Sequence, residues 1–361
     1  MAASALAAVP ISRWMVRRGR RPGLALGYAL AALGSLLVVV AAVASSLVVL
    51  LVGIALFGLG NTSNLLARFA AADLAPPERR GRAIATVLLA TTFGAVLGPN
   101  LAGPSDDLGA LVGLPPLAGP FALCVVAYTL GALVVFGLLR PDPLLAAHGR
   151  AGGAAPAGVA PGISLRASAR ALTAGRARAG LAAMVVANLV MVAIMTMTPV
   201  HLVDHGHSLA VVGFVISAHV AGMFLPSPVT GWLCDRVGRL PVLAAGGVVL
   251  AAAGLLAAGA DAQSDGTIAF ALALLGVGWN LGLIDGSVLL TDAVPLPDRP
   301  QAQGAADLAM GAVGALGSVL SGPALAFGGF ALLGLSGTAL ALALLVIVAR
   351  ARLLDPAPGA S

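Results

Sequence analysis

Three ionisable side chains interrupt long apolar stretches of this sequence: Arg68, His219 and Asp285. A charged group inside a bilayer is costly, so each is a candidate functional residue. Burial favours the neutral forms of Asp and His, and a change in their surroundings would move a proton. Asp285 and His219 are therefore candidates for proton coupling. The alternatives are a histidine that only packs and an aspartate paired with a nearby arginine.

Amide side chains accompany these residues. Asn61, Asn64 and Arg68 are spaced i, i+3, i+7 and share one face of a helix. Asn188 lies among Met184, Met191 and Met195, and Asn280 precedes Asp285 on the same stretch. Methionine adapts to varied apolar ligands, so these residues predict a partly polar, partly soft cavity for a small molecule. We expect Arg68 to extend to the membrane surface rather than bind that molecule.

The segment "HLVDHGHS", 201–208, carries three histidines and one aspartate within eight residues. Its place in a turn between apolar stretches favours a solvated loop over a metal site. The sequence has no phosphate-binding loop, catalytic triad or paired acids. We therefore expect no enzymatic activity, no metal and no cofactor, and we expect an ion gradient, of protons, as the energy source.

The elements that must position these residues are transmembrane helices. The chain is 59% hydrophobic and 9% charged, with a mean hydropathy of +1.02, whereas about a quarter of the residues are charged in soluble domains. This composition predicts an all-α integral membrane protein. Ten stretches are long and apolar enough to span a bilayer: Gly23–Val43, Leu47–Ala72, Ala83–Gly103, Leu117–Leu139, Gly180–Val203, Leu209–Gly231, Leu240–Ala260, Thr267–Thr291, Ala302–Ala326 and Gly328–Arg350.

The basic residues predict the orientation. All 20 are arginine, and outside the apolar stretches they lie in alternate loops, while the opposite loops carry no arginine and hold five aspartates. By the positive-inside rule, the arginine-bearing loops and the C-terminus are cytoplasmic, in the bacterial inner (plasma) membrane. This distribution also accounts for the net charge of +6 without a nucleic-acid partner. The expected partners are the lipid bilayer and a small-molecule substrate, with the protein a monomer.

A repeat divides the chain into two halves. "SRWMVRRGRRP", 12–22, aligns with "GWLCDRVGRLP", 231–241, and "DLAPPERRGRA", from Asp73, aligns with "DAVPLPDRPQA", from Asp292, each at an offset of 219 residues. Parallel repeats of a helical bundle are typical of transporters. The predicted organisation is an N-terminal bundle (1–140), a cytoplasmic linker (141–179) with a short helix near 165–172, a C-terminal bundle (180–351) and a tail (352–361).

The two halves differ in length. Two predicted spans precede the repeated segment in the second half, but only eleven residues precede it in the first. We expect residues 1–11 to be the end of one helix, with two helices' worth of chain absent from the front because the start codon is misplaced or the chain is truncated. This pattern also argues against a signal peptide, because the apolar run after the arginines exceeds the usual length and continues the repeat.

These features resemble the major facilitator superfamily. Motif A of that family, G-x-L-x-D-R-x-G-R-R, is matched by Gly231, Asp235, Arg236, Gly238 and Arg239, and its first-half copy keeps Arg17, Gly19 and Arg20 but has Val16 for the aspartate. The resemblance implies a fold of two pseudo-two-fold related bundles with 12 helices when complete, about ten of them here. It also implies a secondary transporter whose motif stabilises the closed cytoplasmic side.

Specific contacts follow from this resemblance. A carboxylate at Asp235 would face the N-terminus of a neighbouring helix, a favourable place for negative charge. Asp292 would pair with Arg236 or Arg239, and Asp73 with Arg17 or Arg20. Because Val16 removes the first-half carboxylate, we hypothesise that Asp307 supplies it to Arg17, Arg18 or Arg21. The alternative is that these charges only fix topology and solvate loops.

A second family motif, G-x-x-x-G-P-x-x-G-G, is matched by Gly94, Gly98, Pro99 and Gly103. Small residues and a proline allow a helix to bend and to pack closely on a neighbour. The motif favours proton-coupled export, by antiport, of small, partly apolar compounds. A metabolite uptake permease and a non-transporting remnant or interaction protein on the same scaffold are the alternatives.

Overall fold

The computed structural model describes residues 2–150, 175–261 and 263–353, and all regular structure among them is helical. This confirms the all-α prediction. The predicted surface helix near 165–172 lies outside the described residues. The elements are α1 (Ala2–Arg18), α2 (Arg20–Ala44), α3 (Leu47–Leu74), η1 (Pro77–Arg79), α4 (Arg80–Leu111), α5 (Gly119–Leu138), α6 (Pro143–Arg150), α8 (Gly175–Asp204), α9 (Leu209–Phe224), α10 (Ser227–Arg236), α11 (Arg239–Gly259), α12 (Asp265–Ala293), η2 (Leu296–Asp298) and α13 (Arg299–Leu353).

Eight stretches of the described chain are helices long and apolar enough to cross a membrane. Two predicted spans fall within α13, which is interrupted at Gly329, where φ is 65° and ψ is −171°. Only glycine adopts this backbone readily, so the residue separates two helices. Another predicted span is divided between α9 and α10, because Pro226 cannot continue the hydrogen-bond ladder of α9.

The described chain packs into two compact units that exchange short segments. Unit 1 comprises the described residues of Met1–Leu74, Phe93–Ser168 and Leu296–Leu308, and unit 2 those of Ala75–Thr92, Ala169–Pro295 and Ala309–Ser361. The first turns of α4 thus belong with helices of the second sequence half, and the first turns of α13 with helices of the first half.

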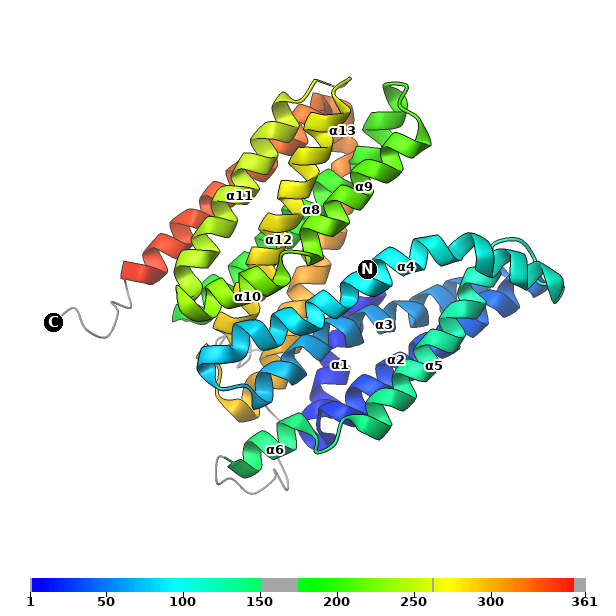
Figure 1. The fold of residues 1–361 in the computed structure, drawn as a ribbon, viewed down its shortest axis with the longest axis horizontal. Helices are drawn as coiled ribbons and strands as arrows, with labels where there is room; N and C mark the ends of the chain where they lie inside the picture. The colour runs from blue at the N-terminus through cyan, green and yellow to red at the C-terminus, as the bar shows by residue number, and fades with distance from the viewer. Residues whose placement is uncertain (1, 151–174, 262, 354–361) are drawn as a thin grey trace. The chain divides into compact units, whose positions relative to one another are not determined.

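Within unit 1, α2 packs against α3 and α5, and α1 packs against α2 and α3 (Figure 1). The contact of α2 with α3 is close: a Cβ added to Gly34 would lie 2.2 Å from the backbone nitrogen of Phe57. In a membrane, helices associate through such small residues, because lipid removes the hydrophobic driving force between them.

Within unit 2, α12 lies among α8, α9, α10 and α11 (Figure 1). In the most apolar 18-residue stretch of α12, 72% of the residues are buried within the protein. Most side chains of this stretch, polar ones included, are therefore enclosed by protein rather than by lipid. A core cluster joins α8, α11 and α12 to the last turns of α13, through Ala183, Leu243, Leu289 and Leu344. This packing fixes α12, which carries Asp285 and Asp292, against the loop between α10 and α11.

The 219-residue repeat is present in the structure. Gly19 and Gly238 both have positive φ, 91° and 101°, and each directly precedes a helix. The short helices η1 and η2 begin at Pro77 and Leu296, again 219 residues apart. The same local sequence therefore forms the same turn in both halves, and glycine is required where φ is positive.

Candidate functional site

Asp235, at the end of α10, accepts hydrogen bonds from the N-terminus of α4. Its Oδ1 lies 2.8 Å from the backbone nitrogen of Gly81, and its Oδ2 lies 3.0 Å from that of Arg82. The first amides of a helix have no acceptor within the helix, and that end carries partial positive charge. The side chain of Asp235 is 2% exposed. The predicted contact between this carboxylate and a helix N-terminus is confirmed.

Two glycines allow this close approach. A Cβ added to Gly81 would lie 2.7 Å from the carbonyl oxygen of Gly231, and one added to Gly231 would lie 2.6 Å from the Cβ of Ala85. Any side chain at either position would separate α4 from α10. The motif glycine Gly231 was predicted, whereas Gly81 was missed. Its position after the arginines of "ERRGR" is the signal that could have identified it.

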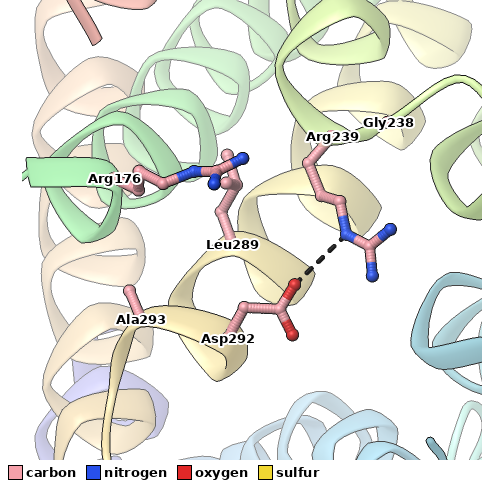
Figure 2. Close-up of a pocket in the computed structure, with 6 residues that line it drawn as sticks. All are labelled: Arg176, Gly238, Arg239, Leu289, Asp292 and Ala293. Atoms are coloured by element: carbon pink, nitrogen blue, oxygen red, sulfur yellow. Dashed lines mark hydrogen bonds and ion pairs between the residues drawn. The ribbon is translucent and has the colours of Figure 1, made fainter. Parts of the chain in front are cut away.

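Asp292, at the end of α12, lies between two arginines. The Nε of Arg239 is 3.1 Å from Oδ2 of Asp292 (Figure 2). Arg80 binds Oδ1 of the same carboxylate. Arg239 also donates to the carbonyl oxygens of Pro77 and Cys234. The sequence predicted Arg236 or Arg239 as the partner of Asp292, and Arg239 is the one found. The sequence did not predict the contact with Arg80. We call the contacts of Asp235 and Asp292 with Arg80, Gly81, Arg82 and Arg239 the α4 latch.

Arg236, the other predicted partner of Asp292, is exposed and lies over the ring of Trp232, 5.6 Å from its centroid.

Beside the α4 latch, a pocket of about 360 Å³ is lined by Arg176, Gly238, Arg239, Leu289, Asp292 and Ala293 (Figure 2). Arg176 extends into it from α8, so cationic groups face the single carboxylate. The pocket can hold water or a small polar group next to the ion pair.

The equivalent ion pair in unit 1 joins Arg20 to Asp73. The Nε of Arg20 lies 2.8 Å from Oδ2 of Asp73, and both side chains are fully buried. Arg20 also donates to the side chain of Gln303, in the part of α13 that belongs to unit 1. Of the two predicted partners of Asp73, Arg20 is the one found, and Arg17 is exposed.

Asp307 corrects two predictions. Its Oδ1 lies 2.6 Å from Nη2 of Arg68, and the Arg68 side chain is fully buried. The hypothesis that Asp307 binds Arg17, Arg18 or Arg21 is therefore wrong, and so is the expectation that Arg68 extends to the membrane surface. A guanidinium beside a buried carboxylate gains more from pairing than from reaching the interface.

The N-terminus of α2 obtains its carboxylate from Asp142, which the sequence did not indicate. Oδ2 of Asp142 accepts from the backbone nitrogen of Arg21 at 2.7 Å, and Oδ1 accepts from those of Leu144 and Leu145, at the start of α6. One side chain thus caps two helices. The contact ties the segment after α5 to the first-half copy of the motif.

Asp285 is fully buried on α12. Neither carboxylate oxygen has a nitrogen or oxygen donor among the described residues, and its polar neighbour is the thiol of Cys234. His219 is also buried, and its Nδ1 lies 2.8 Å from the carbonyl oxygen of Leu272. His219, on α9, therefore has a hydrogen-bond partner on α12. Asp285 has no ionic partner among the described residues.

Asn280 occupies the break between α9 and α10. Its amide nitrogen donates to the carbonyl oxygen of Met223 at 2.7 Å and to the hydroxyl of Ser227 at 2.8 Å, and its oxygen accepts from Thr230. The bond to Met223 gives a donor to a carbonyl group in the last turn of α9, and the bonds to Ser227 and Thr230 hold the first turn of α10, which is how broken helices are tolerated in membranes. Asn280 thus has a structural role that its sequence position did not reveal.

Asn188 links three helices. Its amide nitrogen donates to the carbonyl oxygen of Met310 at 3.0 Å, and its oxygen accepts from the indole nitrogen of Trp279 at 3.2 Å. In unit 1, Asn64 accepts from the hydroxyl of Tyr28 at 2.8 Å, and Asn61 is exposed. Asn61, Asn64 and Arg68 were predicted to share one face of a helix. In the structure they do not act together, because Asn64 binds Tyr28, Arg68 binds Asp307 and Asn61 is exposed.

Gly94, Gly98 and Gly103 lie within α4, which is continuous through them. A Cβ added at any of the three would meet nothing within 4 Å. Within unit 1, no described residue packs on these glycines, so the close packing expected of this face stays a prediction. At the turn after α8, Nδ1 of His207 lies 2.7 Å from Oδ1 of Asp265.

Comparison with known proteins identifies the family. The sequence profile of the Major Facilitator Superfamily matches residues 1–279 and 179–361. The chain is 40% identical over 351 residues to an uncharacterized MFS-type transporter, YdeG, of Bacillus subtilis (strain 168), covering 97% of this chain and 81% of YdeG. It is 30% identical over 324 residues to the riboflavin transporter RfnT of Brucella anthropi, covering 88% and 76% of the two chains.

Two solved structures have a similar fold. The human organic anion transporter MFSD10 matches with a TM-score of 0.71 at 16% identity, covering 96% of this chain and 81% of that one. The fucose:proton symporter FucP of E. coli matches with a TM-score of 0.69 at 19% identity, covering 96% and 87%. These matches confirm the fold that the sequence resemblance implied.

Proposed function

The chain belongs to the Major Facilitator Superfamily, and from that premise we propose that this multi-pass membrane protein is a proton-coupled exporter of small, partly apolar compounds. In each cycle the substrate site is exposed to one side of the membrane and then to the other. The proton gradient drives the substrate outward by antiport. No nucleotide-binding motif occurs in the sequence, which supports an ion gradient as the energy source.

The α4 latch is the observation that carries this proposal. It joins α4, from the first sequence half, to α10 and α12, from the second, through bonds that water can replace, and Arg239 of α11 binds the same Asp292. A hydrogen bond to a charged group contributes about 1.5–3 kcal/mol. A few such bonds stabilise a closed state and still allow it to open on the time scale of transport.

The substrate class is proposed from the side chains of α8. Met191 and Met195 are partly exposed on this helix, close to the amide of Asn188, which favours apolar ligands with a few polar groups. Uptake of a metabolite is the second candidate, because one relative is named a riboflavin transporter.

The direction of coupling can be tested in proteoliposomes with an imposed pH gradient and a clamped membrane potential. Riboflavin and ethidium serve as probes, because a pH gradient does not trap either passively. Antiport accumulates the probe in the acidic compartment and symport in the alkaline one, whatever the orientation of the protein. We expect accumulation in the acidic compartment. Protein-free vesicles are the control, and flux no greater than theirs for both probes contradicts the proposal.

A further inference from the structure

Asp285 occupies a site that is sealed by the α4 latch. A Cβ added to Gly81 would lie 3.0 Å from the Cβ of Cys234 and 2.8 Å from Oδ1 of Asp235, so the first turn of α4 covers Cys234 directly. The thiol of Cys234, fully buried, in turn contacts Asp285. The order from the surface inward is therefore the turn of α4, Cys234 and then Asp285.

The surroundings of Asp285 contain no free cation among the described residues. The charged and titratable groups that act on it are Cys234 and Asp235 of α10 and Arg239 at the start of α11. Arg239 is engaged by Asp292 and by two carbonyl oxygens. An ionised carboxylate without a donor in a buried site costs far more free energy than the neutral acid, so the site favours the protonated form.

We infer that Asp285 binds the proton of the proposed cycle, and that opening of the α4 latch releases this proton by admitting water to Asp285. This inference rests on the proposed function and assigns the coupling site within it. When the first turn of α4 leaves, Cys234 loses its cover, and the carboxylic acid behind it is hydrated and loses its proton to water. The proton and the latch are then linked: protonation stabilises the closed state, and deprotonation stabilises the open one.

Cys234 itself provides the test, because it and Cys124 are the two cysteines of the chain. In a Cys124→Ala background, the rate of modification of Cys234 by N-ethylmaleimide reports how often its cover opens. This rate is divided by the modification rate of the same cysteine in the unfolded protein at the same pH. The division removes the intrinsic pH dependence of the thiol's reaction with the reagent. The assay uses the full chain in membrane vesicles and needs no substrate.

The corrected rate is expected to rise between pH 6 and pH 8, by up to about tenfold per pH unit, because the closed state holds one more proton than the open state. Asp285→Asn should abolish this rise, and Asp285→Glu should keep it. The matched control is Asp261→Asn, an exposed carboxylate in the loop before α12, which should also keep it. A flat profile for the parent protein, or an unchanged slope in Asp285→Asn, would overturn the inference.

Flux measurements separate this inference from the transport proposal. If Asp285→Asn still accumulates a probe against its gradient at the expense of the pH gradient, the inference fails and transport stands. If neither protein carries any probe but the modification profile depends on Asp285 as expected, the transport proposal fails and the link between proton and latch stands.

Discussion

At the scale of single residues, the two units contain ion pairs of different exposure. Arg68 and Asp307 are almost completely buried, whereas the side chain of Asp292 is 30% exposed beside Arg80 and Arg239. Desolvation makes a buried charge costly when its partner is removed, but it also makes an apolar replacement of the whole pair acceptable. The buried pair therefore fixes which groups meet rather than contributing a large net stability.

We predict that Arg68→Met and Asp307→Leu each lower the free energy of unfolding by about 3–5 kcal/mol, whereas the double variant recovers most of the loss. Thermal unfolding of the purified protein, followed by tryptophan fluorescence, measures both effects. Arg18→Met, at an exposed arginine, is the matched control and should change stability by less than about 0.5 kcal/mol. Additive losses in the double variant would contradict a direct pair.

The sequence predicted a helix N-terminus as the partner of Asp235, and it named Arg239 for Asp292 and Arg20 for Asp73 as one of two alternatives each, because these residues lie in segments that align at an offset of 219 residues. It did not predict the pair of Arg68 and Asp307, since two residues 239 positions apart leave no periodic signal. The cap supplied by Asp142 was missed for the same reason: the contact depends on where the segment after α5 folds back, which no local pattern encodes.

At the scale of elements, the α4 latch depends on the distance between two helices. The backbones of α4 and α10 approach so closely at Gly81 and Gly231 that a methyl group would collide with main-chain atoms, which cannot move aside as a flexible side chain can. Most apolar spans and the glycine turn before α11 were predicted from the sequence, whereas the break between α9 and α10 was not. This approach was not predicted either, because many glycines in the chain, such as Gly137, face open space instead.

Gly81→Ala should shift the protein toward the open state. Overpacking of this kind costs about 1–3 kcal/mol, and 1.4 kcal/mol is tenfold in an equilibrium constant, so the modification rate of Cys234 should rise about tenfold or more. Gly137→Ala, within α5, gains the same helix propensity without a collision and should leave the rate unchanged. Equal rates in the two variants would show that the approach does not limit opening.

At the scale of the whole molecule, the described arginines other than Arg68 lie at or near helix ends. They occur around the junctions of α1 with α2, η1 with α4, α10 with α11 and η2 with α13, after α5 and at the end of α6, at the start of α8, and at the end of α13. The α4 latch is built from three of them, so the charges expected to orient the chain in the membrane also provide its closing contacts. By the positive-inside rule, the α4 latch should face the cytoplasm.

Single cysteines in a background without Cys124 and Cys234 test this orientation. A cysteine replacing Asp261 should react with a membrane-impermeant maleimide in intact bacterial cells, and one replacing Arg79 should react only after the cells are broken. Both positions are exposed, so access to the reagent depends on the side of the membrane alone. The opposite pattern would invert the topology, and with it the side on which Asp285 releases its proton.

The two units exchange short segments of the chain. Residues 75–92 pack with unit 2 and residues 296–308 with unit 1, so each sequence half completes its fold with a piece of the other. We therefore expect two polypeptides separated between Arg150 and Gly175 to remain associated through these reciprocal segments, without a covalent connection between the halves.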